Sequence, residues 1–124
     1  MRWIVDGMNV IGSRPDGWWR DRHRAMANLV ESLDRWAADD DAEVTVVFER
    51  PPSPPIESTV VAVTSAPSPA PNSADDEIAR MVRDDPHPEQ IRVATSDRAL
   101  SERVRAAGAT VFPAERFREL IDPR

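Results

Sequence analysis

The sequence predicts an α/β fold, a three-layer α/β/α sandwich around a mainly parallel sheet of five strands. Short apolar runs rich in β-branched residues alternate along the chain with longer segments whose apolar residues recur every three or four positions. This alternation is typical of parallel strands joined by helices that cover both faces of a sheet. With 124 residues, the chain is long enough for one compact domain and too short for two, so residues 1–124 are expected to form a single domain.

Five segments are predicted to be strands because they are short, apolar and β-branched. They are residues 3–5, 44–48, 59–63, 91–95 and 110–112. The predicted helices share the spacing of a single apolar face. They cover residues 21–38, 73–82, 97–107 and a last segment at 117–121. Proline-rich loops are expected at residues 50–55 and 66–72, and the first of them replaces a helix between the second and third strands.

Composition and charge exclude several classes of site. The chain has no cysteine, which excludes disulfides and thiolate metal sites. All 16 basic residues are arginine, so the lysine of a phosphate-binding P-loop is missing. A net charge of −6 argues against a broad basic face for duplex binding and is compatible with an acidic site for cations. No apolar run is long enough to span a membrane and no signal peptide is evident, so a cytoplasmic location is expected.

Acidic residues stand where the predicted strands end. Asp6, Glu49 and Asp97 follow the first, second and fourth strands, and Asp75 and Asp76 begin the helix after the third. In a parallel sheet these side chains gather at the carboxyl edge, where ligands bind. Clustered carboxylates repel one another unless a cation lies between them. Hard oxygen ligands without sulfur or imidazole favour Mg²⁺ or Mn²⁺.

Most of these acids also have a purely structural interpretation. Ser96 and Asp97 stand where a helix N-cap is expected, and Asp75 and Asp76 lie in a first helical turn, where the helix dipole favours anions. Glu49 can equally be a solvated loop residue. The recurrence of acids at four strand ends is what favours a functional site.

The segment Ile4–Gly12, with the sequence IVDGMNVIG, resembles the opening of the NYN domain in its YacP-like branch, within the PIN-like ribonuclease group. The resemblance continues in order through residues 46–49, 73–78 and 93–98. It implies a PIN-like fold with strand order 3-2-1-4-5 and metal-dependent endoribonuclease activity. In that order the first and fourth strands are neighbours, so Asp6 and Asp97 are expected to lie side by side.

The resemblance also assigns site residues. It implies that Asp6, Asp75 and Asp97 are catalytic and bind Mg²⁺ or Mn²⁺, while Asn9 braces the site. Glu49, where relatives often have aspartate, is a less typical ligand, and the neighbouring acid Asp76 is a further candidate ligand. Such ions activate water for attack on phosphorus, and hydrolysis of this kind leaves 5′-phosphate and 3′-hydroxyl ends.

A locally basic segment with adjacent tryptophans follows the first strand, between residues 14 and 24. Arginines pair with phosphates and an indole stacks on an unpaired base, which suits single-stranded RNA. The predicted RNA-binding residues are Arg14, Trp18, Arg20, Arg22, Arg24, Arg50 and Arg98. The alternative is that a tryptophan such as Trp19 packs under the helix while the arginines are solvated. His23 is expected on the surface of the first helical turn, and His87 in a loop.

The sequence therefore predicts a metal-dependent endoribonuclease that acts on RNA, with the ribosome as a further candidate partner. The alternative is a non-catalytic RNA- or ribosome-binding module of the same fold. Two observations keep that alternative open: glutamate rather than aspartate at position 49, and a chain that ends soon after the fifth strand.

Overall fold

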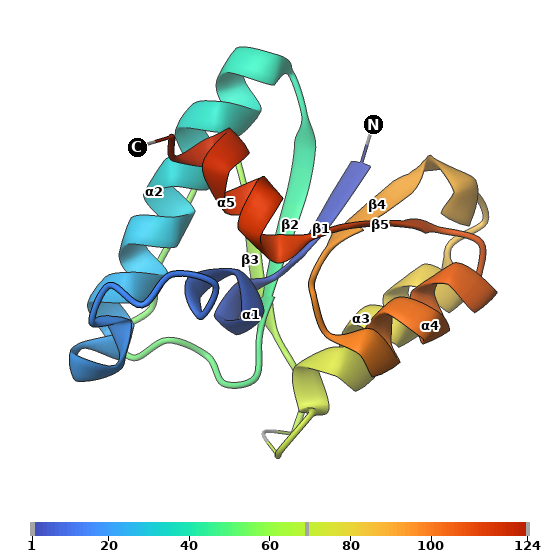
Figure 1. Cartoon of the computed structure of the whole chain (residues 1–124), viewed down its shortest axis with the longest axis horizontal. Helices are drawn as coiled ribbons and strands as arrows, with labels where there is room; N and C mark the ends of the chain where they lie inside the picture. The colour runs from blue at the N-terminus through green and yellow to red at the C-terminus, as the bar shows by residue number, and fades with distance from the viewer. Residues whose placement is uncertain (1, 69, 124) are drawn as a thin grey trace.

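The computed structural model describes residues 2–68 and 70–123. Its centre is a five-stranded sheet, parallel throughout, with strand order β3-β2-β1-β4-β5 (Figure 1). The strands are β1 (Arg2–Asp6), β2 (Glu43–Phe48), β3 (Ala62–Ser65), β4 (Ile91–Ala94) and β5 (Thr110–Phe112). The predicted α/β class, parallel pairing and strand order are confirmed.

Helices cover both faces of the sheet (Figure 1). One face carries α1 (Gly7–Ile11), α2 (Arg22–Asp40) and α5 (Ala114–Ile121), and the other carries α3 (Ser73–Asp84) and α4 (Arg98–Ala106). The described residues also form two short 3₁₀ helices, η1 (Trp18–Arg20) and η2 (Pro88–Gln90). Within the described part of the chain, every helix is too short or too polar to cross a bilayer.

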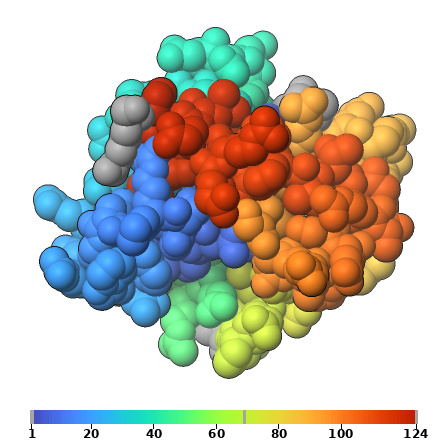
Figure 2. Space-filling model, viewed as in Figure 1, coloured from blue at the N-terminus to red at the C-terminus, as the bar shows by residue number. Residues whose placement is uncertain are grey.

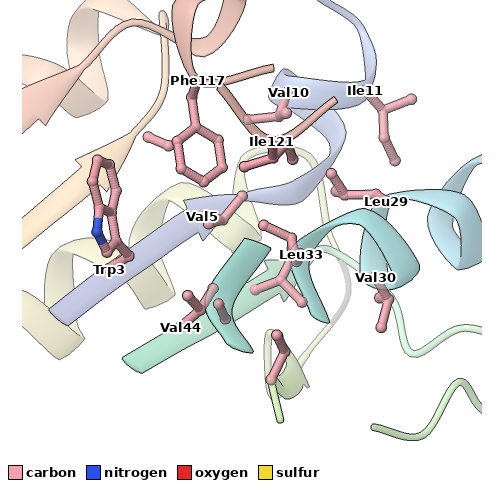
Figure 3. Close-up of a cluster of buried hydrophobic side chains, with 14 of the residues drawn as sticks. Trp3, Val5, Val10, Ile11, Leu29, Val30, Leu33, Val44, Phe117 and Ile121 are labelled. Atoms are coloured by element: carbon pink, nitrogen blue, oxygen red, sulfur yellow. The ribbon is translucent and has the colours of Figure 1, made fainter. Parts of the chain in front are cut away.

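The core is divided by the sheet because successive strand residues point to opposite faces. Trp3 and Val5 pack beneath α2 and α5, beside Leu33 and Phe117 (Figure 3). Ile4, between them in sequence, packs on the other face under α3 and α4. Both sides of β1 are therefore buried, which explains its continuous apolar sequence.

The third strand begins later than predicted, at Ala62 rather than at residue 59. The hydroxyl of Ser58 accepts hydrogen bonds from the backbone N–H groups of Val60 (3.1 Å) and Val61 (3.0 Å). This local turn keeps the preceding segment out of the sheet, and the apolar side chain of Val61 is buried all the same. The β-branched run at residues 59–63 predicts a strand, but its first half forms a turn.

Candidate functional site

The carboxyl edge of the sheet is centred on Asp6, the last residue of β1. β1 lies between β2 and β4, where the strand order reverses direction, and this is where ligands bind in open α/β sheets. Asp6 is only 5% exposed. The Thr95 hydroxyl donates a hydrogen bond to its Oδ2 atom at 2.8 Å. The site thus begins with a buried carboxylate that is oriented by Thr95, the residue directly after β4.

Gly7 allows the chain to turn directly from β1 into α1. A Cβ atom at this position would lie 2.6 Å from Cδ1 of the Phe48 ring, so a side chain would displace that ring. Asp6 is the N-cap residue of α1, and its side chain makes no capping hydrogen bond. α1 is not among the helices predicted from the sequence. Because the Asp6 carboxylate makes no hydrogen bond to the backbone of α1, it remains available to the site.

Asn9 and Thr95 hold the turn between β4 and α4 against α1. The Asn9 Oδ1 atom accepts a hydrogen bond from the Ser96 N–H at 2.8 Å, and the Thr95 hydroxyl oxygen accepts one from the Asp97 N–H at 3.1 Å. Asn9 therefore lies where a bracing residue would act. Thr95 was missed by the sequence reasoning, although a polar residue ending a buried strand beside Asp97 is a detectable signal.

Four acids at this edge lie close enough to interact electrostatically. Burial raises the pKa of Asp6 to about 7, against the hydrogen bond from Thr95, and the nearby charges of Asp75, Asp97 and Glu49 raise it further. The pKa of Asp75 is also raised, first by burial and then by Asp97, while Arg103 opposes the shift. These four carboxylates therefore form the acidic cluster of the candidate site.

Asp97 and Asp76 each also bond to another residue of the fold. The Asp97 Oδ1 atom accepts a hydrogen bond from the Leu100 N–H at 2.8 Å and caps α4, so the N-cap interpretation and proximity to the site both hold. Asp76 instead pairs with Arg103 on α4 at 2.8 Å, and its side chain is 72% exposed. The structure thus separates Asp75, which faces the cluster, from Asp76, which pairs on the surface.

The chemistry of the acidic cluster suits a hard divalent cation, because all of its donors are carboxylate oxygens. Across residues 2–68 and 70–123, however, no three acidic or histidine side chains are placed so that they could hold one ion together. Ion binding here would therefore require the carboxylates to move closer to one another.

Five of the predicted RNA-binding arginines occupy exposed positions. They are Arg20, Arg22, Arg24, Arg50 and Arg98. None of the five forms an ion pair with another described residue. Arg14 differs from them, since it pairs with Asp122 at 3.0 Å and Glu119 at 3.2 Å and its side chain is only 12% exposed. Arg14 thus anchors the loop after α1 to α5.

The adjacent tryptophans have different environments. Trp18 is half-buried against the core, and the Arg22 guanidinium lies 5.1 Å from its ring centroid. Trp19 is 49% exposed, with Arg20 at 5.9 Å from its ring. Of the two, the indole of Trp19 is therefore the more accessible to a base, whereas the sequence analysis named Trp18.

His23 is half-buried and His87 is exposed. His23 is in the first turn of α2, and its Nε2 atom lies 2.8 Å from the carbonyl oxygen of Pro54. This contact ties α2 to the proline-rich loop after β2. His87 precedes η2, outside regular secondary structure.

The segments that carry these side chains are neighbours on one face of the molecule. Figure 2 shows the blue N-terminal segment, the green loop after β2, the yellow-green start of α3 and the orange start of α4 together in the lower half of the view. The acids and the exposed arginines therefore come from segments far apart in sequence that meet at one edge.

Comparison with known proteins gives the same architecture. The chain is similar to the crystal structure of Rae1 (YacP) from Bacillus subtilis, at 25% sequence identity and a TM-score of 0.78, over 97% of this chain and 73% of that one. A mutant form of that protein gives a TM-score of 0.74 at 25% identity, over 98% of this chain and 76% of the other. None of the curated protein sequences matches significantly. The model of the YacP-like NYN domain matches residues 3–123, and the chain therefore belongs to the YacP-like NYN domain family.

Proposed function

We propose that this protein is an endoribonuclease that hydrolyses single-stranded RNA with the help of Mg²⁺ or Mn²⁺. The observation that carries the proposal is the buried Asp6 carboxylate, which has three further acids near it and no cationic partner among the described residues. Burying such a group is unfavourable for folding. Groups with strongly shifted pKa values in a site of this kind are typical of function. Membership of the YacP-like NYN domain family is consistent with a ribonuclease.

In this proposal Asp6, Asp75 and Asp97 would hold the divalent ion, with Glu49 as an adjacent fourth carboxylate. A bound ion supplies an activated water and neutralises the charge that develops on the phosphate. Asp76 is the candidate that the structure favours least, because it pairs with Arg103.

The remaining residues act by binding and positioning. Thr95 orients the Asp6 carboxylate, and Asn9 holds the turn that carries Asp97. The exposed arginines would pair with RNA phosphates, and Trp19 would stack on an unpaired base. The ribosome is a further candidate context for this substrate, so RNA should be tested both free and bound to ribosomes.

Calorimetric titration with Mn²⁺ tests the ion site directly. We expect the wild-type protein to bind Mn²⁺, and the double variant Asp6→Asn/Asp97→Asn to lose this binding. Asp84→Asn is the matched control, since Asp84 is an exposed acid that pairs with Arg80 on α3. Cleavage of single-stranded RNA should require Mn²⁺ or Mg²⁺ and leave 5′-phosphate ends. A 2′,3′-cyclic phosphate product would contradict attack by water.

A non-catalytic RNA-binding module is the second candidate. It is favoured by the absence, among the described residues, of three ligands already converging on one ion. It predicts RNA binding with neither Mn²⁺ uptake nor cleavage, on free or ribosome-bound RNA. The titration and the cleavage assay together distinguish the two functions.

A further inference from the structure

A small cavity beside the acidic cluster is not used by the proposed chemistry. It has a volume of about 160 Å³ and is lined by Met8, Met26, Phe48, Glu49, Arg22 and Arg50. We propose that this cavity receives one unpaired nucleobase of the RNA, from a nucleotide next to the phosphate held at the acidic cluster. This inference rests on the proposed function and adds a base-binding subsite to it.

The position of the cavity follows from the sheet. Asp6 pairs in register with Val47, and Phe48 is the next residue of β2. The Phe48 ring lies against Gly7, directly after Asp6, which leaves no room for a Cβ atom there. Met8 follows in α1, and Glu49 belongs both to the cavity wall and to the acidic cluster. The cavity therefore adjoins the acidic cluster through Glu49.

The lining suits the flat face of a base. Met8 and Met26 are half-buried, and their polarizable thioethers make favourable contacts with aromatic rings. Phe48 lines the cavity and is only 1% exposed. At about 160 Å³, the cavity is smaller than the pockets of roughly 300 Å³ or more that take drug-sized ligands. It thus matches a single base rather than a whole nucleotide.

The charges at the cavity favour a nucleic acid over an apolar peptide side chain. Arg22 and Arg50 both line it, and neither has a carboxylate partner among the described residues. Arg22 lies against the Trp18 ring, which holds its guanidinium near the cavity. With two arginines and the single carboxylate of Glu49, the charged groups at the cavity carry a net positive charge. An apolar cavity of this kind is complementary to a base that carries phosphates on both sides.

The test combines a protein variant with RNA that lacks single bases. A short fluorescein-labelled single-stranded oligoribonucleotide, with an abasic site at each position in turn, is titrated with protein in Ca²⁺ and followed by anisotropy. For the wild type we expect an abasic site at one position to weaken binding about fivefold or more. For Met26→Ala, the same abasic site should change affinity by less than about twofold, since the base no longer has its contact.

Met81→Ala is the matched control. Met81 is also a half-buried methionine on a helix, but it lies on the other face of the sheet and lines a separate cavity. Met81→Ala should show the same loss of RNA affinity at that one abasic position as the wild type. Thermal melting of both methionine variants shows that each is folded. A charge control, Arg105→Ala, removes an exposed arginine near the far end of α4 and should leave the abasic profile unchanged.

The possible failures are distinguishable. RNA that is cleaved with Mn²⁺ but shows equal effects of abasic sites at all positions overturns the subsite alone. The same holds if Met26→Ala retains the position-specific loss of the wild type. RNA that binds with this loss and is never cleaved overturns the proposed activity and supports the subsite. Absence of RNA binding at any accessible concentration overturns both.

Discussion

The charged side chains at the two ends of strand β1 differ in whether they have a partner of opposite charge. At its start, the Arg2 guanidinium donates hydrogen bonds to both carboxylate oxygens of Asp85, at 2.5 and 2.9 Å. These bonds lower the pKa of Asp85 to about 2. At its end, Asp6 is buried and has no cationic partner among the described residues, and burial raises its pKa to about 7.

The arginines also differ in their partners. Arg2, Arg35 and Arg80 pair with acids of this chain, whereas Arg92, Arg105 and Arg116 form no ion pair with another described residue. The five exposed arginines predicted to bind RNA also have no acidic partner among residues 2–68 and 70–123. The carboxyl edge is therefore distinguished by the buried Asp6 carboxylate, which has other acids near it and no cationic partner among the described residues, and not by the pairing of the arginines.

The largest effect should come from removing the charge of Asp6. We expect Asp6→Asn to lower the rate of RNA cleavage by about a thousandfold or more, because the divalent ion contributes several kcal/mol of transition-state stabilisation. Single-turnover cleavage with saturating Mn²⁺ measures this rate. Asp84→Asn serves as the control and should cleave at the wild-type rate. Cleavage by Asp6→Asn within tenfold of wild type would remove Asp6 from the proposed mechanism.

The same variant should be more stable than the wild type at high pH. Because the pKa of Asp6 is higher in the folded than in the unfolded chain, the folded state favours the protonated form. The wild-type free energy of unfolding therefore contains a loss that develops as pH rises from about 4 to about 7. Asparagine avoids this loss, so Asp6→Asn should gain up to about 4 kcal/mol above pH 7 and little at pH 4.

Urea denaturation of both proteins at several pH values, without divalent ions, measures this difference. Adding Mn²⁺ at pH 8 should stabilise the wild type and leave Asp6→Asn unchanged. A variant that is less stable than the wild type at every pH would mean that Asp6 contributes to folding and is not strained by its surroundings.

At the other end of β1, the expected effect is smaller and has the opposite sign. Asp85→Asn removes the partner of Arg2 and should decrease stability at neutral pH, with no change in RNA cleavage. The pKa of Asp85 is lowered in the folded chain, so its contribution is present above the ordinary aspartate pKa and is lost as pH falls toward about 2. Thermal melting at pH 7 and at pH 2 should show a difference between wild type and variant only at the higher pH.

The smallest effect is expected for Asp76, which pairs with Arg103 on the surface. Asp76→Asn should change the free energy of unfolding by less than about 1 kcal/mol, as is usual for exposed ion pairs. Cleavage should stay within about threefold of wild type, whereas Asp75→Asn should reduce it strongly. Equal losses in the two variants would show that Asp76 also belongs to the ion site.

The strands and most helices were predictable because their signals are local. Apolar runs mark β1, β2 and β4, and the spacing of Leu29 and Leu33 marks α2. The position of acids after strands could also be read from the chain, since parallel strands bring their carboxyl ends to one edge. Local patterns gave a wrong prediction at two places. The start of β3 was predicted too early, because the Ser58 hydroxyl forms a turn there, and α1, which begins at Gly7 directly after β1, was not predicted.

The amino-acid sequence alone determined the fold class, the strand order and the set of candidate acids, through local periodicity and the family resemblance. Which of several similar residues belongs to the candidate site depends on the packing between segments that are distant in the sequence. Arg14 pairs with Asp122, 108 positions away, and is therefore not one of the exposed arginines without an acidic partner. Asp75 faces the acidic cluster while Asp76 pairs with Arg103. Such choices depend on which elements meet in space, and that information is absent from the spacing of residues along the chain.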